Sequence, residues 1–278
     1  MRHCVCLGLL LVAPVLAVDT TQLKTSKDPM VLLRISMECA ASQSPADLNA
    51  LLEALSSPSF LNRLDSQEEY LGPPDKLRLA RVMRALTDNP TGHPLLVALT
   101  AKRSFTSLEQ RQDLLIRALA GVRPAPEAAV RFWERNSTPD AVYLQVTIDA
   151  LADNSSQPAL ALLEKRLADP RYDPDEKVAW MRDPVLRHRG DLEMLRICER
   201  LLAGRLPAAL RPDLVEALCD YRPEWYLSER PPRPPAIATF TPEARAELRK
   251  ICQLALQQVK LSDGQKQAVR KTLAELEP

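Results

Sequence analysis

The sequence contains few aromatic residues and few glycines. Phe, Trp and Tyr make up 4% of its 278 residues and Gly occurs 7 times, whereas Pro occurs 24 times. Strands favour β-branched and aromatic side chains, so a chain whose apolar residues are mostly Ala and Leu is better suited to helices. Pro disrupts helix interiors but fits first turns and loops. The composition therefore predicts many short helices joined by many turns.

The sequence also lacks a marked excess of either charge. Its 37 Lys and Arg residues and 36 Asp and Glu residues leave a formal net charge of +1. This balance provides no bulk electrostatic reason to expect binding to nucleic acid or to an acidic membrane surface. We therefore expect no nucleic-acid partner.

The usual catalytic and cofactor-binding motifs are missing as well. Beyond residue 17 the only histidines are His93 and His188, and the chain has no H-E-x-x-H, no C-x-x-C, no Gly-rich phosphate loop and no G-x-S-x-G. The acidic stretch around Asp169, Asp173 and Asp175 lacks the spacing and the glycine of a calcium loop, and helix capping accounts for it better. The sequence thus predicts no cofactor, no metal site and no catalytic residues.

The first 17 residues have the pattern of a signal peptide. Arg2 precedes an apolar run, and Val15 and Ala17 have the small-residue spacing of a cleavage site after Ala17. The run is too short to span a bilayer comfortably, and no second run of the required length follows. We expect residues 1–17 to be removed, residues 18–27 to form a flexible mature N-terminus, and the protein to be exported, either periplasmic or secreted. The Ala-rich composition, with more Arg than Lys, indicates a bacterial source.

Four cysteines follow the predicted cleavage point. Each lies in a helical apolar pattern, where Cys behaves as a small hydrophobe, and their spacing does not resemble a compact disulfide framework. We expect free thiols, with a Cys198–Cys219 or a Cys219–Cys252 disulfide as the alternatives. The four residues are Cys39, Cys198, Cys219 and Cys252.

One short phrase recurs along the chain at intervals of about 32 residues. "IRALAG" ends at Gly121, and similar phrases are "MRALTD", "IDALAD", "VEALCD" and a fainter "LEALSS". An apolar residue stands two positions before the Ala of the phrase and a Leu one position after it, so both lie on one helical face. An interval of this length is typical of two short helices and two turns. The Ala residues are Ala54, Ala85, Ala118, Ala150 and Ala217.

The predicted helix starts recur too. Pro74, Pro139 and Pro174 each precede an Asp. Pro in the first turn, followed by a carboxylate at the positive end of the helix dipole, is typical of a helix start. After each phrase, a polar turn leads to a second apolar segment that predicts a second helix. These segments are "HPLLVALTA", "PEAAVRFWERN", "QPALALLEKRLAD" and "DLEMLRICERLLAG", the last with Gly204 as the expected C-terminal cap.

These features resemble HEAT and armadillo-type α-solenoid repeats. The resemblance depends on the period, the Pro–Asp start, the "R-A-L-x-D" end of the first helix and the short second helix. It implies an all-α fold, a right-handed α-solenoid of antiparallel helix pairs in a HEAT-like superhelix. Tetratricopeptide repeats are the nearest competitor, but their Trp/Leu-Gly/Tyr pattern is absent. We expect HEAT-like repeats over 28–227, a Pro-rich linker or long loop over 228–240 and a capping helix pair over 241–278.

The most irregular unit surrounds Val185. Pro184 stands inside the expected first helix, within a run of Arg and Asp residues. One interpretation is a kinked helix that presents guanidinium groups to an acidic partner, since Arg binds carboxylates bidentately. The interpretation we favour is a Pro-broken helix whose Arg and Asp side chains pair across a solvated turn. An aromatic pair near the end of the repeats is a further candidate contact. The candidate partner-binding residues are Arg182, Arg187, His188, Arg189, Trp225 and Tyr226.

The sequence favours a non-catalytic protein-binding or scaffold role in the cell envelope or outside the cell. An α-solenoid offers an extended surface to another protein, although the fold alone does not define a function. The alternative is an enzyme or accessory subunit, similar to lyase-like HEAT proteins, which would need a pocket near Arg182 and His188. A structural spacer that tolerates surface substitutions everywhere is a third hypothesis.

Overall fold

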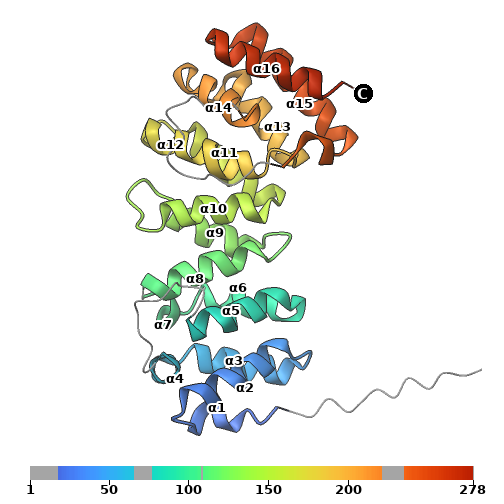
Figure 1. Cartoon of the computed structure of the whole chain (residues 1–278). Coiled ribbons are helices and arrows are strands. Elements are labelled where there is room, and N and C mark those ends of the chain that lie inside the picture. Colours follow the sequence, from blue (N-terminus) through green and yellow to red (C-terminus); the bar gives the residue numbers. More distant parts are fainter. Residues whose placement is uncertain (1–17, 66–76, 108, 221–234, 278) are drawn as a thin grey trace, which may run out of the picture.

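The computed structural model describes residues 18–65, 77–107, 109–220 and 235–277, and every regular element in these ranges is helical. The helices follow one another in chain order along an elongated stack, from α1 (Thr21–Thr25) to α16 (Asp263–Glu275) (Figure 1). The all-α prediction is therefore confirmed. In these ranges no helix combines the length and the apolar character needed to cross a membrane. The expected signal peptide, 1–17, lies outside them.

Most helices belong to one of two rows. The first row comprises α2 (Pro29–Ala41), α5 (Arg78–Asp88), α8 (Glu109–Ala120), α10 (Leu144–Asn154), α12 (Pro174–Trp180) continued by η3 (Met181–Val185), α14 (Arg211–Leu218) and α16. The second row comprises α3 (Pro45–Leu55), α6 (His93–Leu99), α9 (Glu127–Asn136), α11 (Gln157–Ala168), α13 (Leu192–Arg200) continued by η4 (Leu201–Arg205), and α15 (Pro242–Gln258). The helices α1, α4 (Pro58–Leu64) and α7 (Arg103–Thr106) lie outside the rows.

Within each row, consecutive helices pack on one another, except at α6 and α9 of the second row. In the first row α2 packs on α5, α5 on α8, α8 on α10, α10 on η3, η3 on α14, and α14 on α16. In the second row α3 packs on α6, α9 on α11, α11 on α13, and α13 on α15. The Leu of the recurring phrase lies in these contacts and is at most 1% exposed, at Leu86, Leu119, Leu151 and Leu218. Burial of such a side chain contributes about 1.5–3 kcal/mol before conformational entropy is subtracted.

The predicted second helices are confirmed as α6, α9, α11 and α13. Gly204 lies in the last turn of the fourth with φ of 147°, a conformation that favours glycine. The start at Pro174 is also confirmed, and Asp173 caps α12. The start at Pro139 is wrong, because residues 138–143 form hydrogen-bonded turns and α10 begins only at Leu144. Pro74 lies outside the described residues.

The structure corrects two further expectations near the N-terminus. The sequence pattern predicts that the phrase around Ala54 ends the first helix of a unit. It instead ends a second-row helix, α3, which packs on α6, whereas α2 of the first row packs on α5. Its Ala-Leu pair is buried like the others, so burial alone does not distinguish the rows. The segment 18–27, expected to be flexible, contains α1. Leu23 of α1 is 2% exposed, and Arg63 donates hydrogen bonds to the Leu23 and Lys24 carbonyls at 3.1 Å.

The C-terminal helix pair is present as α15 and α16. Thr241 caps α15, and Ser262 and Gln265 form a reciprocal capping box at the start of α16. Of the Pro-rich segment 228–240, only residues from 235 onward are described. Phe240 there is 6% exposed and packs close to Gly190.

Two asparagines make the same contact at two places in the first row. Asn89, at the end of α5, donates from Nδ2 to the Ala40 and Ser42 carbonyls at 2.8 and 2.9 Å. Asn154, at the end of α10, donates to the Ala120 and Val122 carbonyls at 3.0 and 2.9 Å. In both cases the amide oxygen accepts a bond from the backbone N–H two residues later. These asparagines join the ends of consecutive first-row helices, whose last carbonyls have no partner within the helix.

The end of α8 also lies very close to α5. Thr87 Oγ1 donates to the carbonyls of Met83 and Ala118, at 3.0 and 3.2 Å. This holds its methyl group against Gly121, where any Cβ would overlap Thr87 Cγ2. The glycine of "IRALAG" is therefore required by close packing.

Candidate functional site

The arginines singled out in the sequence lie at the end of the first-row helix formed by α12 and η3. The expected break at Pro184 is absent, because Met181–Val185 form a π-helical turn that accommodates an extra residue. The chain stays helical beyond it, and His188 N bonds to the Pro184 and Val185 carbonyls at 3.3 and 3.2 Å. Val185 follows Ala150 by 35 residues rather than about 32, and the π turn supplies one of the additional residues.

Arg187 joins η3 to α10. Its Nη2 lies 3.1 Å from Asp149 Oδ1, its Nη1 3.0 Å from Asp153 Oδ1, and its Nε 2.8 Å from Asp183 Oδ1. His188 Nε2 lies 3.0 Å from the same Asp153 oxygen. Burial by itself would raise the pKa of Asp153, but the hydrogen bond with His188 and the charge of Arg187 bring it below the ordinary value. At Asp149 burial outweighs Arg187, so the pKa is raised.

Arg182 joins η3 to α14. Its Nη2 lies 3.2 Å from Asp213 Oδ1 and 3.1 Å from Glu216 Oε2. Glu216 in turn accepts a hydrogen bond of 2.9 Å from Gln265 Nε2 of α16. Burial raises the pKa of Asp213 even though Arg182 opposes it. These contacts connect three consecutive first-row elements.

Arg189 is 6% exposed and donates to backbone carbonyls, to Leu218 O from Nη1 at 3.3 Å and to Pro235 O from Nη2 at 3.0 Å. The structure thus brings only Arg187 and His188 to a common partner, Asp153, whereas Arg182 and Arg189 make contacts with other helices and segments. Their role in binding a partner stays a prediction. Trp225 and Tyr226 lie outside the described residues.

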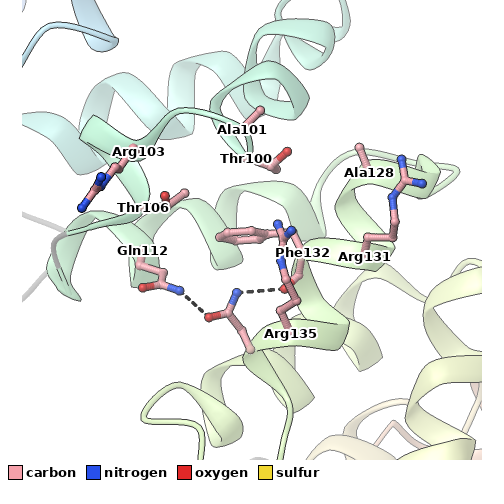
Figure 2. Close-up of a pocket in the computed structure, with 10 residues that line it drawn as sticks. Thr100, Ala101, Arg103, Thr106, Gln112, Ala128, Arg131, Phe132 and Arg135 are labelled. Carbon is pink, nitrogen blue, oxygen red and sulfur yellow. Dashed lines mark hydrogen bonds between the residues drawn. The ribbon is translucent and has the colours of Figure 1, made fainter.

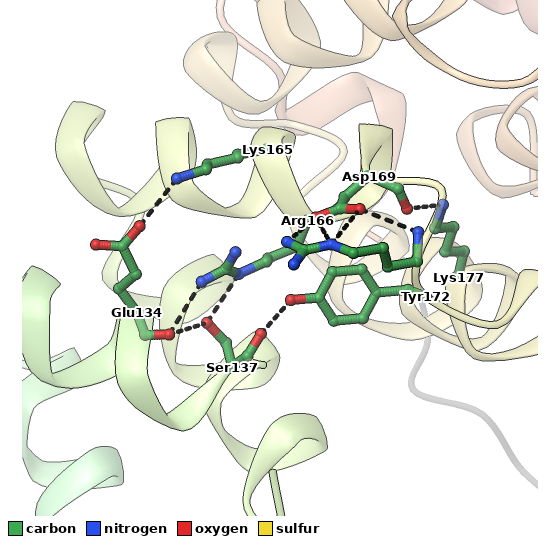
Figure 3. A network of polar contacts seen from close by, with 8 residues as sticks. Glu134, Ser137, Lys165, Arg166, Asp169, Tyr172 and Lys177 are labelled. Carbon is green, nitrogen blue, oxygen red and sulfur yellow. Dashed lines mark hydrogen bonds and ion pairs between the residues drawn. The ribbon is translucent and has the colours of Figure 1, made fainter. Parts of the chain in front are cut away.

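A second polar network links α9, α11 and the start of α12 (Figure 3). Arg166, 4% exposed, donates from Nε to Ser137 Oγ and from Nη2 to a carbonyl of α9, both at 3.0 Å. Its guanidinium lies 5.9 Å from the ring centre of Tyr172, whose hydroxyl donates to the Ser137 carbonyl. Lys177, 1% exposed, donates to the Asp169 carbonyl, and burial lowers its pKa. Because each of these side chains is bonded within the chain, we assign the network to structure.

The four cysteines are free, as expected. Cys39 and Cys198 are buried, and burial raises the pKa of each thiol to about 12. Cys219 is partly exposed and lies in hydrogen-bonding contact with Cys252 and Thr272. The bond with Cys252 lowers the pKa of Cys219, and the same bond together with burial raises that of Cys252. Of the two alternative disulfides, the structure therefore places the Cys219–Cys252 pair in contact.

An open pocket of about 640 Å³ lies between α6–α7 and α9 (Figure 2). Arg131 and Arg135 line it from α9, and Arg103, at the start of α7, lines it from the opposite side. The Phe132 ring between the two α9 arginines is 2% exposed, and the Arg135 guanidinium lies 6.0 Å from its centre. We call Arg103, Arg131 and Arg135 the pocket arginines.

The pocket arginines have little compensating charge. Arg131 pairs with Glu127 at 2.8 Å, but the two side chains are 63% and 81% exposed, so solvent screens the pair. Among the described residues, neither Arg103 nor Arg135 has a carboxylate partner. Sequence reasoning missed this site. Its signal was the Arg131–Arg135 spacing of one helical turn, but the third arginine comes from α7, which the sequence pattern did not predict.

A second pocket, of about 670 Å³, lies between α5 and α8 and also contains arginines. Here Arg117 pairs with Asp113 at 3.1 Å, and Arg84 lies 4.0 Å from Asp88. Arg84 and Arg117 thus each have a carboxylate one helical turn away, as Arg131 has in the first pocket, whereas Arg81, which also lines this second pocket, pairs with no carboxylate among the described residues. This pocket provides a matched comparison for the first.

Comparisons with protein-family models, with curated proteins and with solved structures find no match. Within the described ranges, no group of three or more His, Cys, Asp or Glu side chains is arranged to hold a metal ion.

Proposed function

We propose that this protein is an exported, non-catalytic α-solenoid of the HEAT type that binds another protein along its stacked helices. The two-row order supports the solenoid, because in such arrays each unit packs mainly on its neighbours. The matching contacts of Asn89 and Asn154 support repetition, since the same bond recurs between consecutive helix ends. The resemblance to HEAT repeats in sequence supports the family.

The observation that carries the binding role is the elongated stack itself. Its helices follow in chain order from one end to the other, so much of each pair faces solvent on an extended surface (Figure 1). The enzyme alternative has less support. Arg182 and His188, which it requires as pocket groups, are paired with carboxylates of α14 and α10 and line neither of the two pockets described above.

Export is the part of the proposal that depends on residues 1–17. Mass spectrometry of the protein from its native host should find Val18 as the mature N-terminus, in a periplasmic or culture-medium fraction. An intact N-terminus, with the protein confined to the cytosolic fraction, would contradict export.

The binding role is tested by capture under native conditions. A C-terminally tagged chain is cross-linked in the fraction where it accumulates, and co-purified proteins are quantified by mass spectrometry. We expect one partner at near-stoichiometric yield. The control is the same chain carrying Asn89→Ala and Asn154→Ala, which loosens the stack and should lose that partner. Absence of a stoichiometric partner, or equal capture by the loosened chain, argues against the proposal.

A further inference from the structure

The pocket between α6–α7 and α9 coincides with an interruption of the second row. Farther along, α9, α11, α13 and α15 pack in direct succession. Before α9, however, α6 ends at Leu99 and the four-residue α7 follows, so an open volume of about 640 Å³ remains beside α9. The pocket is thus a local departure from the regular stack, and it is open to solvent.

The charges in this pocket contribute little to the stability of the fold, because the repulsion between Arg131 and Arg135 opposes the attraction of the exposed Glu127–Arg131 pair. Arg131 and Arg135 are four residues apart on one exposed helix face, an arrangement that disfavours a helix by about 0.2–0.5 kcal/mol. Arg103 adds a third positive charge from α7. Arg182 and Arg187 behave differently, because each guanidinium pairs with carboxylates of another helix, and the buried Arg189 donates to backbone carbonyls. In the pocket, Arg131 pairs only with the exposed Glu127, and Arg103 and Arg135 have no carboxylate partner among the described residues, so positive charge remains available to an external anion.

We propose that the pocket arginines bind an acidic segment of the partner protein, with its Asp or Glu carboxylates seated on Arg103, Arg131 and Arg135. The proposal rests on the protein-binding function above and assigns it a site and a partner chemistry. A guanidinium binds a carboxylate through two parallel hydrogen bonds, and such charge-assisted bonds are roughly twice as strong as bonds between neutral groups. Each pocket arginine has N–H groups available for this geometry.

The floor of the pocket is held in place before any ligand arrives. Gln112 donates to Asn136 Oδ1, and Asn136 Nδ2 donates to the Phe132 carbonyl at 2.8 Å (Figure 2). Asn136 is 7% exposed, so this chain of bonds is shielded from water. It fixes the end of α9 next to Arg135. A preorganised floor reduces the entropy lost on binding.

The same features favour a peptide over a nucleic acid. Proteins that bind single strands stack the bases on accessible aromatic rings, and Phe132 is buried with Arg135 over it. Proteins that bind duplexes present a long basic stripe, whereas this chain has a net charge of +1 and many of its arginines are paired with carboxylates.

The experiment measures binding of a fluorescein-labelled octaglutamate peptide to residues 18–278 by fluorescence anisotropy in 50 mM NaCl. We expect Arg103→Gln, Arg131→Gln and Arg135→Gln each to weaken binding about three- to tenfold, and the triple variant to weaken it at least about thirtyfold. Because all three side chains are exposed, the variants should unfold at the same urea concentration as the parent chain. The matched control, Arg84→Gln in the pocket between α5 and α8, removes the same charge and should change the affinity less than about twofold.

Competition distinguishes the class of ligand. Unlabelled octaglutamate should displace the probe, while octaglutamine, inorganic phosphate and a twelve-nucleotide DNA strand should not at the same concentration. Displacement by phosphate or DNA overturns the peptide assignment. If Arg84→Gln loses as much affinity for octaglutamate as the pocket variants, the pocket is not the binding site, because binding would then depend on the total positive charge of the chain.

The two proposals fail separately. If a stoichiometric partner is captured equally well by the triple arginine variant, the binding function stands and the pocket assignment is wrong. If octaglutamate binding depends on the pocket arginines but no partner is captured from the native fraction, the pocket stands and the scaffold proposal is wrong.

Discussion

Replacement of Asn154 by Ala is the sharpest test of how the first row is held together. The Asn154 side chain is 0% exposed and donates two hydrogen bonds, to Ala120 O at 3.0 Å and to Val122 O at 2.9 Å. It thereby connects the end of α10 to the end of α8. Alanine removes both donors and leaves the two carbonyls buried beside a small void.

The expected loss follows from these bonds. Each hydrogen bond contributes about 0.5–1.5 kcal/mol net, and a buried carbonyl left without a partner costs about 1–3 kcal/mol. Some relaxation at the helix end will recover part of this loss. We therefore expect Asn154→Ala to lower the free energy of unfolding by about 2–4 kcal/mol. Asn89→Ala should have a similar effect, because Asn89 makes the corresponding two bonds between α5 and α2, two first-row contacts earlier.

The assay is urea unfolding of residues 18–278 followed by circular dichroism at 222 nm. The control is Asn49→Ala on the exposed face of α3, which should be neutral or slightly stabilising, because Ala has a higher helix propensity than Asn. Asn154→Asp keeps the size but replaces the donor with an acceptor, so it should destabilise at least as much as Ala at pH 7. A loss below about 0.5 kcal/mol in Asn154→Ala would refute the reasoning, since two buried bonds cannot contribute so little.

Three further predictions concern packing, thiol reactivity and pH. Gly121→Ala should lower the free energy of unfolding by about 1–3 kcal/mol, because the added Cβ overlaps Thr87 Cγ2. Adding Thr87→Ser to this variant removes the methyl group and should restore most of the lost stability. An unaltered urea midpoint in Gly121→Ala would contradict the overlap. In the folded chain of residues 18–278, iodoacetamide should modify Cys219 first, because this thiol is partly exposed and its pKa is lowered. Peptide mapping by mass spectrometry measures the order of modification, and modification of Cys39 before Cys219 would contradict the prediction. The folded-state pKa of Asp153 lies below its ordinary 3.8, so the ionised carboxylate stabilises the fold above pH 3.8, and this stabilisation is lost as the pH falls through the folded-state pKa. The free energy of unfolding of Asp153→Asn should therefore fall less steeply between about pH 5 and pH 2 than that of the parent chain. Equal slopes for the two chains would exclude a stabilising role for the Asp153 carboxylate.

Much of the helical pattern could be predicted from the sequence because its signals are local. The Thr241–Pro242 start of α15, the Asp173–Pro174 start of α12 and the apolar stripes of the second helices each depend on residues within one or two turns. Prediction failed where a local signal was ambiguous. Pro139 lies in a turn, and the Ala-Leu pair at Ala54 is as well buried in a second-row helix as it would be in the first.

The candidate sites were less predictable, because their partners are distant in sequence. The π turn at Pro184 keeps η3 helical, and this orients Arg187 toward Asp149 and Asp153, which are 38 and 34 residues earlier in the chain. From the sequence, Pro184 between Arg182 and Arg187 indicated a broken helix instead. The pocket arginines depend on α7, a four-residue helix with too few positions to show a periodic pattern.

Local sequence patterns specify that this chain is helical, where several of its helices begin, and which face of each is apolar. These properties follow from backbone hydrogen bonding, capping and periodicity within a single segment. The stacking of the helices specifies which of them share a row, which charges pair with one another and which arginines remain available. Ion pairs and buried amide bonds depend on groups that folding brings within about 3 Å, so their partners become defined only when the helices are stacked.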